Sequence, residues 1–439
     1  MPDVYLFATL GALVGIIVGI LPGLGHTVAM IMLYPFLSGL HAFEIIAIYV
    51  AMITVTAYHG SIAAILLGIP GEPECLPSMK EGLGMSTRGE ANLALGVAAI
   101  SSFLGSIIGV LLSLLIYVIG ANYYFLYNFV FQLILLLGII GVIFYNSGKQ
   151  YLVTGALMIS GYLLGKVGFN QLTREHFLTF DNPYLYSGLP TLPILIYLYS
   201  IPILVMIKKE NLLKLGASKF NWKVKVPVFT TLRASLIGFF AGFTPILGTF
   251  VSANLAHAIE RRVRGSEYNH QGDYHCLAAS QAANHAGLIG CLIPLLCFAI
   301  PITASEGVLF ELISPKGIVF NLSWVLKNFH WILGVFILAN IIGVITAWPM
   351  ARIITTIIGW LTNYFKYIGI TVLIGISFWM GQKEGQLWFY MAVSAVLLPI
   401  GLLLRKQDLL PLVVTFLLAE NIDNISSIVY RLHLKGLIQ

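Results

Sequence analysis

The sequence predicts an all-α integral membrane protein with two inverted-topology repeats, each a re-entrant helical hairpin plus about five transmembrane helices. Three observations lead to this fold class. The chain of 439 residues is 58% hydrophobic and only 10% charged, which is too little polar surface for a water-soluble protein. Apolar stretches of membrane-spanning length recur along it, and helices satisfy their backbone polar groups inside a bilayer. The third observation is a glycine–proline break that occurs in both halves.

The first break interrupts the apolar segment 4–40, where a membrane helix would otherwise continue. It reads Gly19-Ile20-Leu21-Pro22-Gly23-Leu24-Gly25. Proline lacks a backbone donor and clashes with the preceding turn, while glycine adopts backbone conformations closed to other residues. The sequence therefore predicts two apolar arms that form a re-entrant hairpin.

The same outline returns in the apolar segment 229–258, as Gly242-Phe243-Thr244-Pro245-Ile246-Leu247-Gly248. Each hairpin is followed by an apolar segment that ends in an Ile-Pro pair, at Pro70 and at Pro301. Two broken segments at corresponding positions of two halves are typical of a transporter binding site near the bilayer midplane. The alternative is that glycine and proline only kink and pack helices here, but two matched breaks favour a site.

Ten further apolar stretches are long enough to cross a membrane or nearly so, five in each half. The expected spans lie near residues 42–69, 93–118, 123–145, 151–167, 190–207, 276–300, 331–349, 367–382, 387–404 and 409–426. In the first of these spans, Tyr58-His59-Gly60-Ser61 is interpreted as a weak point in the helix.

A basic segment, residues 208–228, separates the two halves and contains six lysines and a single acidic residue. Basic loops face the cytoplasm, which also accounts for the net charge of +6 without a nucleic-acid partner. The predicted domains are therefore a first transmembrane repeat, 1–207, a cytoplasmic linker, 208–228, and a second repeat, 229–439. An odd number of crossings between the hairpins gives the halves opposite orientations. The link 72–90 is then cytoplasmic, and the link after Pro301 lies outside.

No catalytic or metal-binding constellation stands out. Neither His-Glu-x-x-His nor Gly-x-Ser-x-Gly occurs, so the prediction is a protein that is not an enzyme and has no catalytic residues. The spacing of His270, Asp273 and His275 suits a metal, but their polar loop favours solvated side chains. The cysteines have no paired spacing and are expected to be small buried hydrophobic residues without a disulfide or metal: Cys75, Cys276, Cys291 and Cys297.

Two groups of ionisable residues flank the motifs. The histidines are interpreted as hydrogen-bonded packing residues, with proton coupling as the alternative: His26, His59, His257 and His285. The glutamates beside the Ile-Pro pairs are interpreted as solvated interfacial carboxylates, with gating or coupling as the alternative: Glu72, Glu74, Glu306 and Glu311.

Several motifs together resemble the TctA-type large permease subunit of the tripartite tricarboxylate transporter family. The break at 19–25 is similar to the glycine–proline signature of that family, and residues 59–73, His-Gly-Ser-Ile-Ala-Ala-Ile-Leu-Leu-Gly-Ile-Pro-Gly-Glu-Pro, resemble its second signature. Residues 89–103 continue the likeness. In the second half the motifs at 242–248 and 281–286 are similar but degraded, with Ile246 where the family usually has glycine.

This resemblance implies uptake of small organic carboxylates, driven as symport by a cation gradient across the cell membrane. It implies no cofactor other than a coupling ion, Na+ or H+. It also implies a small membrane subunit and a periplasmic binding protein as partners, besides the anionic substrate and membrane lipid. The sequence leaves the oligomeric state open, a homodimer included, and does not distinguish among carboxylates.

The sequence predicts that main-chain dipoles hold the substrate, because no Lys or Arg lies close to either break. Amides at the start of a half-helix attract anions, glycines let a ligand approach, and nearby polar side chains add contacts. The predicted substrate-binding residues are Gly23, Gly25, Ser61, Pro70, Gly71, Thr244, Gly248, Asn284 and Thr303. Secondary candidates, for the coupling ion, are Pro22, Pro245 and Asn254.

Two other functions are weighed against a carrier. An intramembrane enzyme would need a catalytic motif, and none is found. A channel-like or scaffold subunit without carrier activity is favoured by the degraded second repeat. A flux far above carrier turnover would indicate a channel, and no flux at all would indicate a scaffold.

Overall fold

The computed structural model describes ten continuous stretches and a few single positions between them. The stretches are 3–20, 25–68, 72–119, 150–169, 176–206, 224–243, 248–298, 303–318, 322–361 and 365–405. Within them the chain is almost entirely helical, as predicted. The exception is a short antiparallel pair formed by β1 (Gly168–Phe169) and β2 (His176–Phe177).

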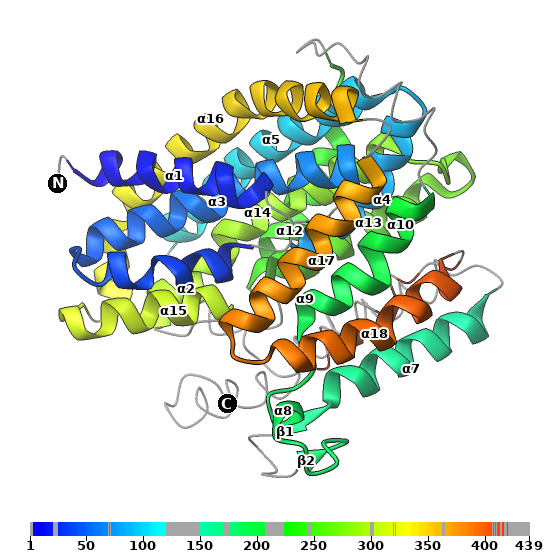
Figure 1. The fold of residues 1–439 in the computed structure, drawn as a ribbon. Helices are drawn as coiled ribbons and strands as arrows, with labels where there is room; N and C mark the ends of the chain where they lie inside the picture. The colour runs from blue at the N-terminus through cyan, green and yellow to red at the C-terminus, as the bar shows by residue number, and fades with distance from the viewer. Residues whose placement is uncertain are drawn as a thin grey trace. The chain divides into compact units, whose positions relative to one another are not determined.

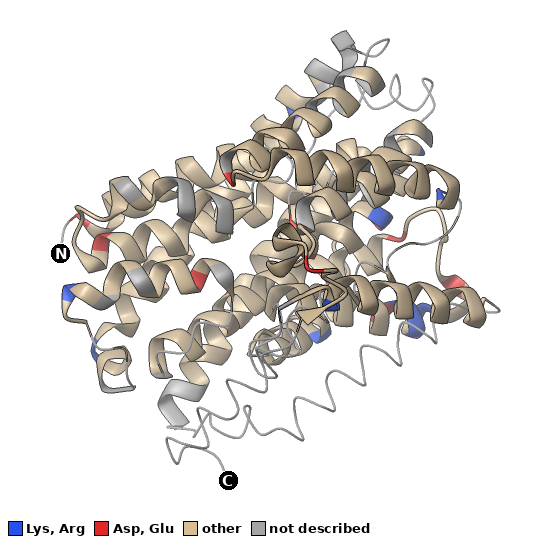
Figure 2. Ribbon diagram, turned by 60° about the horizontal axis from the view of Figure 1, so that its bottom comes forward, with Lys and Arg blue, Asp and Glu red and all other residues tan. Residues whose placement is uncertain are grey.

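Five of the described helices are long and apolar enough to cross a membrane. They are α3 (Ala42–Leu67), α5 (Ala91–Ile119), α14 (Tyr274–Phe298), α16 (Leu322–Leu361) and α18 (Leu387–Leu404). Charged residues lie mainly at helix ends and in connecting segments (Figure 2). The prediction of a multi-pass, all-α membrane protein is thereby confirmed. The full number of crossings stays a prediction, because 123–145 and most of 409–426 lie outside the described residues.

The described elements fall into two compact units. The larger unit contains α1 (Val4–Ile20), α2 (His26–Leu37), α3, η1 (Pro73–Cys75), α4 (Leu76–Thr87), α5, α12 (Val228–Gly242), α13 (Gly248–Arg264), η4 (Gly265–Glu267), α14, α15 (Ala304–Ile313), η5 (Ser314–Lys316) and α16. The smaller unit contains the β1–β2 pair, α7 (Tyr151–Lys166), α8 (Pro183–Tyr186), α9 (Thr191–Ile194), the π-helical stretch η3 (Leu195–Ser200), α10 (Ile201–Met206), α17 (Phe365–Lys383) and α18. The division at 208–228 into two repeats stays a prediction.

In the larger unit, helices from the two halves of the sequence pack in matching pairs. In the first half, α1 lies against α3 (Figure 1). The contact is close because Gly15 and Gly19 face α3: an added Cβ would lie 2.7 Å from the Met52 carbonyl oxygen and 2.7 Å from the Thr56 carbonyl oxygen, respectively. Small residues at spacings of four bring helix backbones together in this way.

The second half repeats this arrangement with α12 and α14. An added Cβ at Gly238 would lie 2.3 Å from the carbonyl oxygen of Ala283, and one at Gly242 would lie 2.5 Å from that of Gly287. The elements that follow these pairs contact elements of the other half of the sequence. Helix α2 of the first half packs on α15 of the second, and α13 of the second half packs on η1 and α4 of the first. Corresponding elements of the two halves therefore occupy corresponding places. Their inverted orientation in a membrane stays a prediction.

Both expected breaks separate two helices. The first helix ends at Ile20 and the next begins at His26, while α12 ends at Gly242 and α13 begins at Gly248. The turns themselves, residues 21–24 and 244–247, lie outside the described residues.

The expected weak point at Tyr58–Ser61 is wrong, because α3 is continuous from Ala42 to Leu67. The polar side chains there bond to carbonyls of their own helix instead of opening it: His59 Nδ1 lies 2.9 Å from the Val55 oxygen, and Ser61 Oγ lies 2.8 Å from the Ala57 oxygen.

Candidate functional site

A short turn with two buried glutamates lies between the starts of the two second hairpin arms. Helix α3 stops at Gly68, which adopts the left-handed conformation (φ 66°) that glycine accepts readily. The chain then forms η1, with Glu72 just before it and Glu74 inside it. The two glutamates are only 3% and 5% exposed.

Glu72 binds the start of α2. Its Oε1 accepts hydrogen bonds from the backbone amide of His26 and from the imidazole Nδ1 of the same residue. Gly25 makes room for this contact, since an added Cβ there would lie 3.3 Å from the same carboxylate oxygen. A backbone amide at the start of a half-helix was the group predicted to hold an anion, and here it holds the carboxylate of Glu72.

Glu74 reaches the start of the other arm. Its Oε1 accepts a hydrogen bond of 3.3 Å from the hydroxyl of Thr249, the second residue of α13. One turn of the chain thus contacts both hairpins. Side-chain ligand atoms of His26, Glu72 and Glu74 all lie within 4.8 Å of one another. We call these three residues the η1 cluster.

The charges within the η1 cluster depend on one another. Nδ1 of His26 contacts Oε1 of Glu72, so a protonated imidazole there forms an ion pair with that carboxylate. Glu74 is buried beside Glu72, and two negative charges at such close range repel each other strongly. The contacts therefore favour a His26–Glu72 ion pair together with a protonated Glu74.

The prediction that these glutamates are solvated is wrong for Glu72, Glu74 and Glu306, which are buried. Each is bonded to the start of a helix: Glu72 to that of α2, Glu74 to that of α13, and Glu306 to that of α15. The backbone amide of Thr303 donates to Glu306 Oε2 at 3.1 Å, and the amide of Glu306 donates to Thr303 Oγ1 at 3.2 Å. This reciprocal pair is a capping box, a structural role for Thr303 that the sequence pattern Thr-x-x-Glu indicates.

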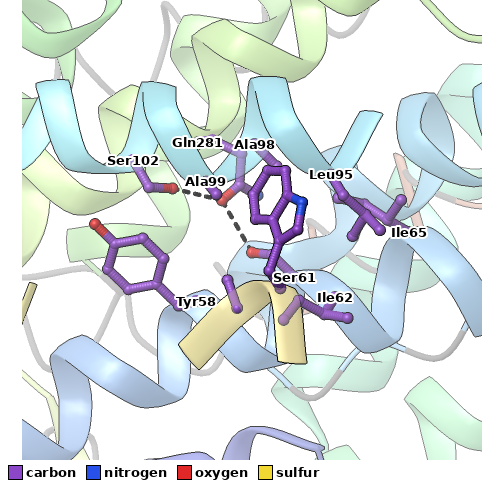
Figure 3. Close-up of a pocket in the computed structure, with 11 residues that line it drawn as sticks. Tyr58, Ser61, Ile62, Ile65, Leu95, Ala98, Ala99, Ser102 and Gln281 are labelled. Carbon is purple, nitrogen blue, oxygen red and sulfur yellow. Dashed lines mark hydrogen bonds between the residues drawn. The ribbon is translucent and has the colours of Figure 1, made fainter. Parts of the chain in front are cut away.

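Ser61 and Gln281 line a small, mostly apolar cavity within the larger unit (Figure 3). Oε1 of Gln281 lies 2.9 Å from Ser61 Oγ and accepts a 3.0 Å hydrogen bond from Ser102 Oγ. On its other side, Gln281 Nε2 donates to Ser78. The cavity volume is about 10 Å³, which is enough for about one water molecule. In this conformation the cavity holds no room for a substrate.

Asn284 lies one turn beyond Gln281 on α14 and is 1% exposed. Among the residues that the structure describes, neither its Oδ1 nor its Nδ2 has a hydrogen-bond partner. Buried amides are nearly always bonded, so an unbonded one indicates a missing partner. Two turns further, the Cys291 thiol lies where a Cβ on Gly248 would be, at 2.3 Å. Asn284 thus lies on the face of α14 that leads to the start of α13.

The structure brings several predicted site residues together and leaves others outside its description. Gly25 and Gly248 flank the arms that meet at η1, and Pro70 lies buried just before it. Asn254, nearly two turns into α13, donates to the Phe250 carbonyl of its own helix at 2.9 Å. The following predicted residues lie outside the described residues: Pro22, Gly23, Gly71, Thr244 and Pro245.

The histidines divide into two kinds. His59 fits the packing interpretation: it bonds within α3 and to Thr346, at 3.3 Å. His285 is buried, with Ser106 at 3.4 Å. His26 and His257 instead pair with the buried carboxylates of Glu72 and Glu81, a pairing that no local sequence pattern indicates. Asp273, expected in a solvated loop, is buried and accepts from the amides of His275 and Cys276. The four cysteines are buried and free, as predicted.

Apolar helices, two broken arms and a buried polar centre define a multi-pass membrane protein of the transport class. The sequence model of the tripartite tricarboxylate transporter TctA family matches residues 5–414, and the chain belongs to this family. Over 311 residues it is 26% identical to an uncharacterized 52.8 kDa protein in the TAR-I ttuC' 3' region of Agrobacterium vitis. That alignment covers 66% of this chain. The chain spans about 60% of the length of this relative. No solved structure matches the chain.

Proposed function

We propose that the chain is the permease subunit of a cation-coupled secondary transporter for small organic carboxylates. Membership of the TctA family supports a component of a tricarboxylate transport system. The observation that carries the proposal is the meeting of the starts of α2 and α13 at η1. Two helix starts present their partial positive charge to one small, buried region, which suits an anion with two or more carboxylates.

The unbonded amide of Asn284 supports the same location. An amide that can both donate and accept suits a carboxylate or a hydroxyl of the substrate. The small cavity beside Gln281 is too small for a carboxylate substrate, so the helices that line it would have to move apart for a substrate to enter there. Alternating movement of one repeat against the other is the usual means in carriers built from two repeats.

The proposal includes the partners that a tripartite system requires. These are a small membrane subunit and a periplasmic protein that binds the substrate and delivers it. The permease is then a multi-pass protein of the cell membrane. Its apolar exposed side chains, such as Leu152 at 91% and Leu403 at 82%, are those expected to face lipid or the small subunit.

The test is transport by the purified protein in liposomes, with the small membrane subunit and the binding protein of its system added. Each of a panel of dicarboxylates and tricarboxylates is offered under a sodium gradient, a pH gradient or neither. We expect accumulation above the external concentration for at least one carboxylate, only with a gradient. Flux without accumulation at rates far above carrier turnover would indicate a channel. Absence of any flux across the panel would contradict transport and favour a scaffold.

A further inference from the structure

The η1 cluster presents a difficulty for a carboxylate carrier. Its amide at the start of α2 is occupied by the carboxylate of Glu72, and Glu74 lies directly beside it. Two buried carboxylates and an incoming carboxylate repel one another strongly where water is excluded. Among the residues that the structure describes, the ion pairs of Glu72 and Glu74 include no Lys or Arg. A positive charge has to come with the substrate.

Titratable groups that interact with the cluster come from five of the elements around it. Helix α4, which also packs on η1, carries Lys80 and Glu81 further along the helix, where Glu81 pairs with His257. Helix α2 provides His26, η1 provides Cys75, α3 provides Tyr49, α14 provides Cys291 and α15 provides Glu306. Helix α13 contributes only the hydroxyl of Thr249. His26 is thus the one base among these groups, and its imidazole is already bound to Glu72. The remaining carboxylates are Glu306, which already accepts from the amide of Thr303, and Glu74, which lies in the cluster itself beside Glu72.

We propose that the Glu72–Glu74 pair is the coupling site for one proton, shared between the two carboxylates and carried together with the substrate. This inference rests on the proposed function and names its coupling ion. The pair suits a proton because two buried carboxylates that lie close together can share one, and Glu72 and Glu74 are such a pair. A sodium site would instead favour oxygen ligands alone, whereas His26 supplies a nitrogen.

The proton changes the charge that a substrate meets. With Glu74 protonated, the positive charge of His26 balances Glu72 and the cluster is neutral, so the helix starts can attract an anion. When an O–H bond of the pair breaks and its proton leaves to the cytoplasm, the cluster carries one net negative charge. That charge expels the bound carboxylate.

The deciding variant is Glu74→Gln, which resembles the protonated side chain permanently. In liposomes that contain the permease and its partners, two assays run in parallel. Counterflow measures exchange of labelled for unlabelled carboxylate without a gradient, and the second assay measures accumulation driven by a pH gradient. We expect Glu74→Gln to retain counterflow within about twofold of wild type and to lose gradient-driven accumulation at least tenfold. Glu90→Gln, at an exposed side chain, is the matched control and retains both.

The outcomes separate this inference from the proposed function. Wild-type protein that shows no counterflow contradicts carboxylate transport itself. Counterflow together with accumulation that follows a sodium gradient, or that persists in Glu74→Gln, overturns the proton site and leaves transport intact. A stoichiometric divalent metal that copurifies with wild type and is absent from Glu74→Gln also overturns it, since the cluster would then be a metal site.

Discussion

At the scale of single residues, Asn284 is distinguished among the described buried side chains because both of its polar atoms, Oδ1 and Nδ2, lack a hydrogen-bond partner. Asn328, for comparison, donates to the Trp324 carbonyl at 2.8 Å and accepts from Trp331 Nε1 at 3.0 Å. Asn284 has no such partners among the described residues. An unbonded polar group costs about 1–3 kcal/mol in a folded protein. A residue retained at that cost is expected to bond something that the permease meets only during transport.

Replacing Asn284 by leucine, of similar volume, should therefore separate stability from activity. We expect Asn284→Leu to raise the melting temperature in detergent and to reduce carboxylate uptake at least tenfold. Asn328→Leu is the matched comparison: it leaves Trp331 Nε1 without an acceptor, so it should lower the melting temperature while uptake per folded molecule is retained. Uptake by Asn284→Leu at the wild-type level would exclude a role in the site.

Glu81 shows the opposite situation, a buried carboxylate with every contact filled. Its Oε1 accepts from His257 Nε2 and from the Tyr268 hydroxyl, each at 2.8 Å, and its Oε2 accepts from the amide of Asp273 at 2.8 Å. Burial raises the pKa of Glu81, but its hydrogen bond and electrostatic interaction with His257 outweigh burial and lower it. The hydrogen bonds of Glu81 thus link α4 to α13 and to the segment before α14.

This shift predicts how stability depends on pH. Because the folded-state pKa of Glu81 is below the unfolded one, its carboxylate stabilises the fold above about pH 4, and this contribution is lost as the pH falls through the folded pKa. Glu81→Gln should lower the free energy of unfolding by about 3 kcal/mol at neutral pH and by less on acidification. Melting temperatures of both proteins between neutral pH and about pH 3 test this. Parallel curves would contradict it.

At the scale of elements, the glycines of α1 and α12 set how closely each arm approaches its long partner helix. Gly15 shows this most simply, since an added Cβ would meet the Met52 carbonyl at 2.7 Å and the Val55 Cβ at 3.0 Å. Neither neighbour can move without shifting α3. Where Gly375 lies on α17, by contrast, an added Cβ would meet nothing within 4 Å.

We expect Gly15→Ala to destabilise the permease by about 1–3 kcal/mol through overpacking, whereas Gly375→Ala should be neutral or slightly stabilising. Thermal unfolding in the same detergent compares the two variants with wild type. Equal melting temperatures for Gly15→Ala and wild type would show that α1 can move away from α3, and would contradict the close contact at Gly15 as a source of stability.

Elements were also what the sequence predicted best. The apolar stretches placed α3, α5, α14 and α18 within a few residues of their observed ends, because length and hydropathy decide a membrane helix. The two breaks were predicted because proline and glycine end helices through local sterics. Glu72 and Glu74 were misjudged, because their burial depends on His26 and Thr249, which are remote in the sequence. A local pattern carries no information about such long-range partners.

At the scale of the larger unit, hydrogen bonds join two pairs of segments, and the two segments of each pair are predicted to share a membrane face. The Arg88 guanidinium donates to the carbonyl oxygens of Gln271 and Gly272, which joins the link 72–90 to the segment before α14. Lys316 Nζ donates to the Ser38 oxygen at 2.8 Å, which joins η5 to the loop after α2. Inverted repeats predict the first pair on the cytoplasmic face and the second outside.

Labelling from outside the cell tests this topology. Cysteines introduced at Glu90 and at Pro315, both exposed, are treated in intact cells with a maleimide that does not cross membranes. We expect Pro315→Cys to react and Glu90→Cys to react only after the cells are opened. The four native cysteines are buried, and the unmodified permease serves as the blank. Reaction at both positions in intact cells would exclude the inverted arrangement.

The hydrogen bond between Glu72 and the backbone amide of His26 also affects which solutes can bind at the start of α2. An acid with a single carboxyl group offers that amide nothing that the tethered side chain does not already supply, and it lacks the advantage of covalent attachment. A solute with two or three carboxyl groups can engage both helix starts at once, so its second contact follows the first at high effective concentration. Selection for polyvalent acids would then arise from competition with the protein's own carboxylate.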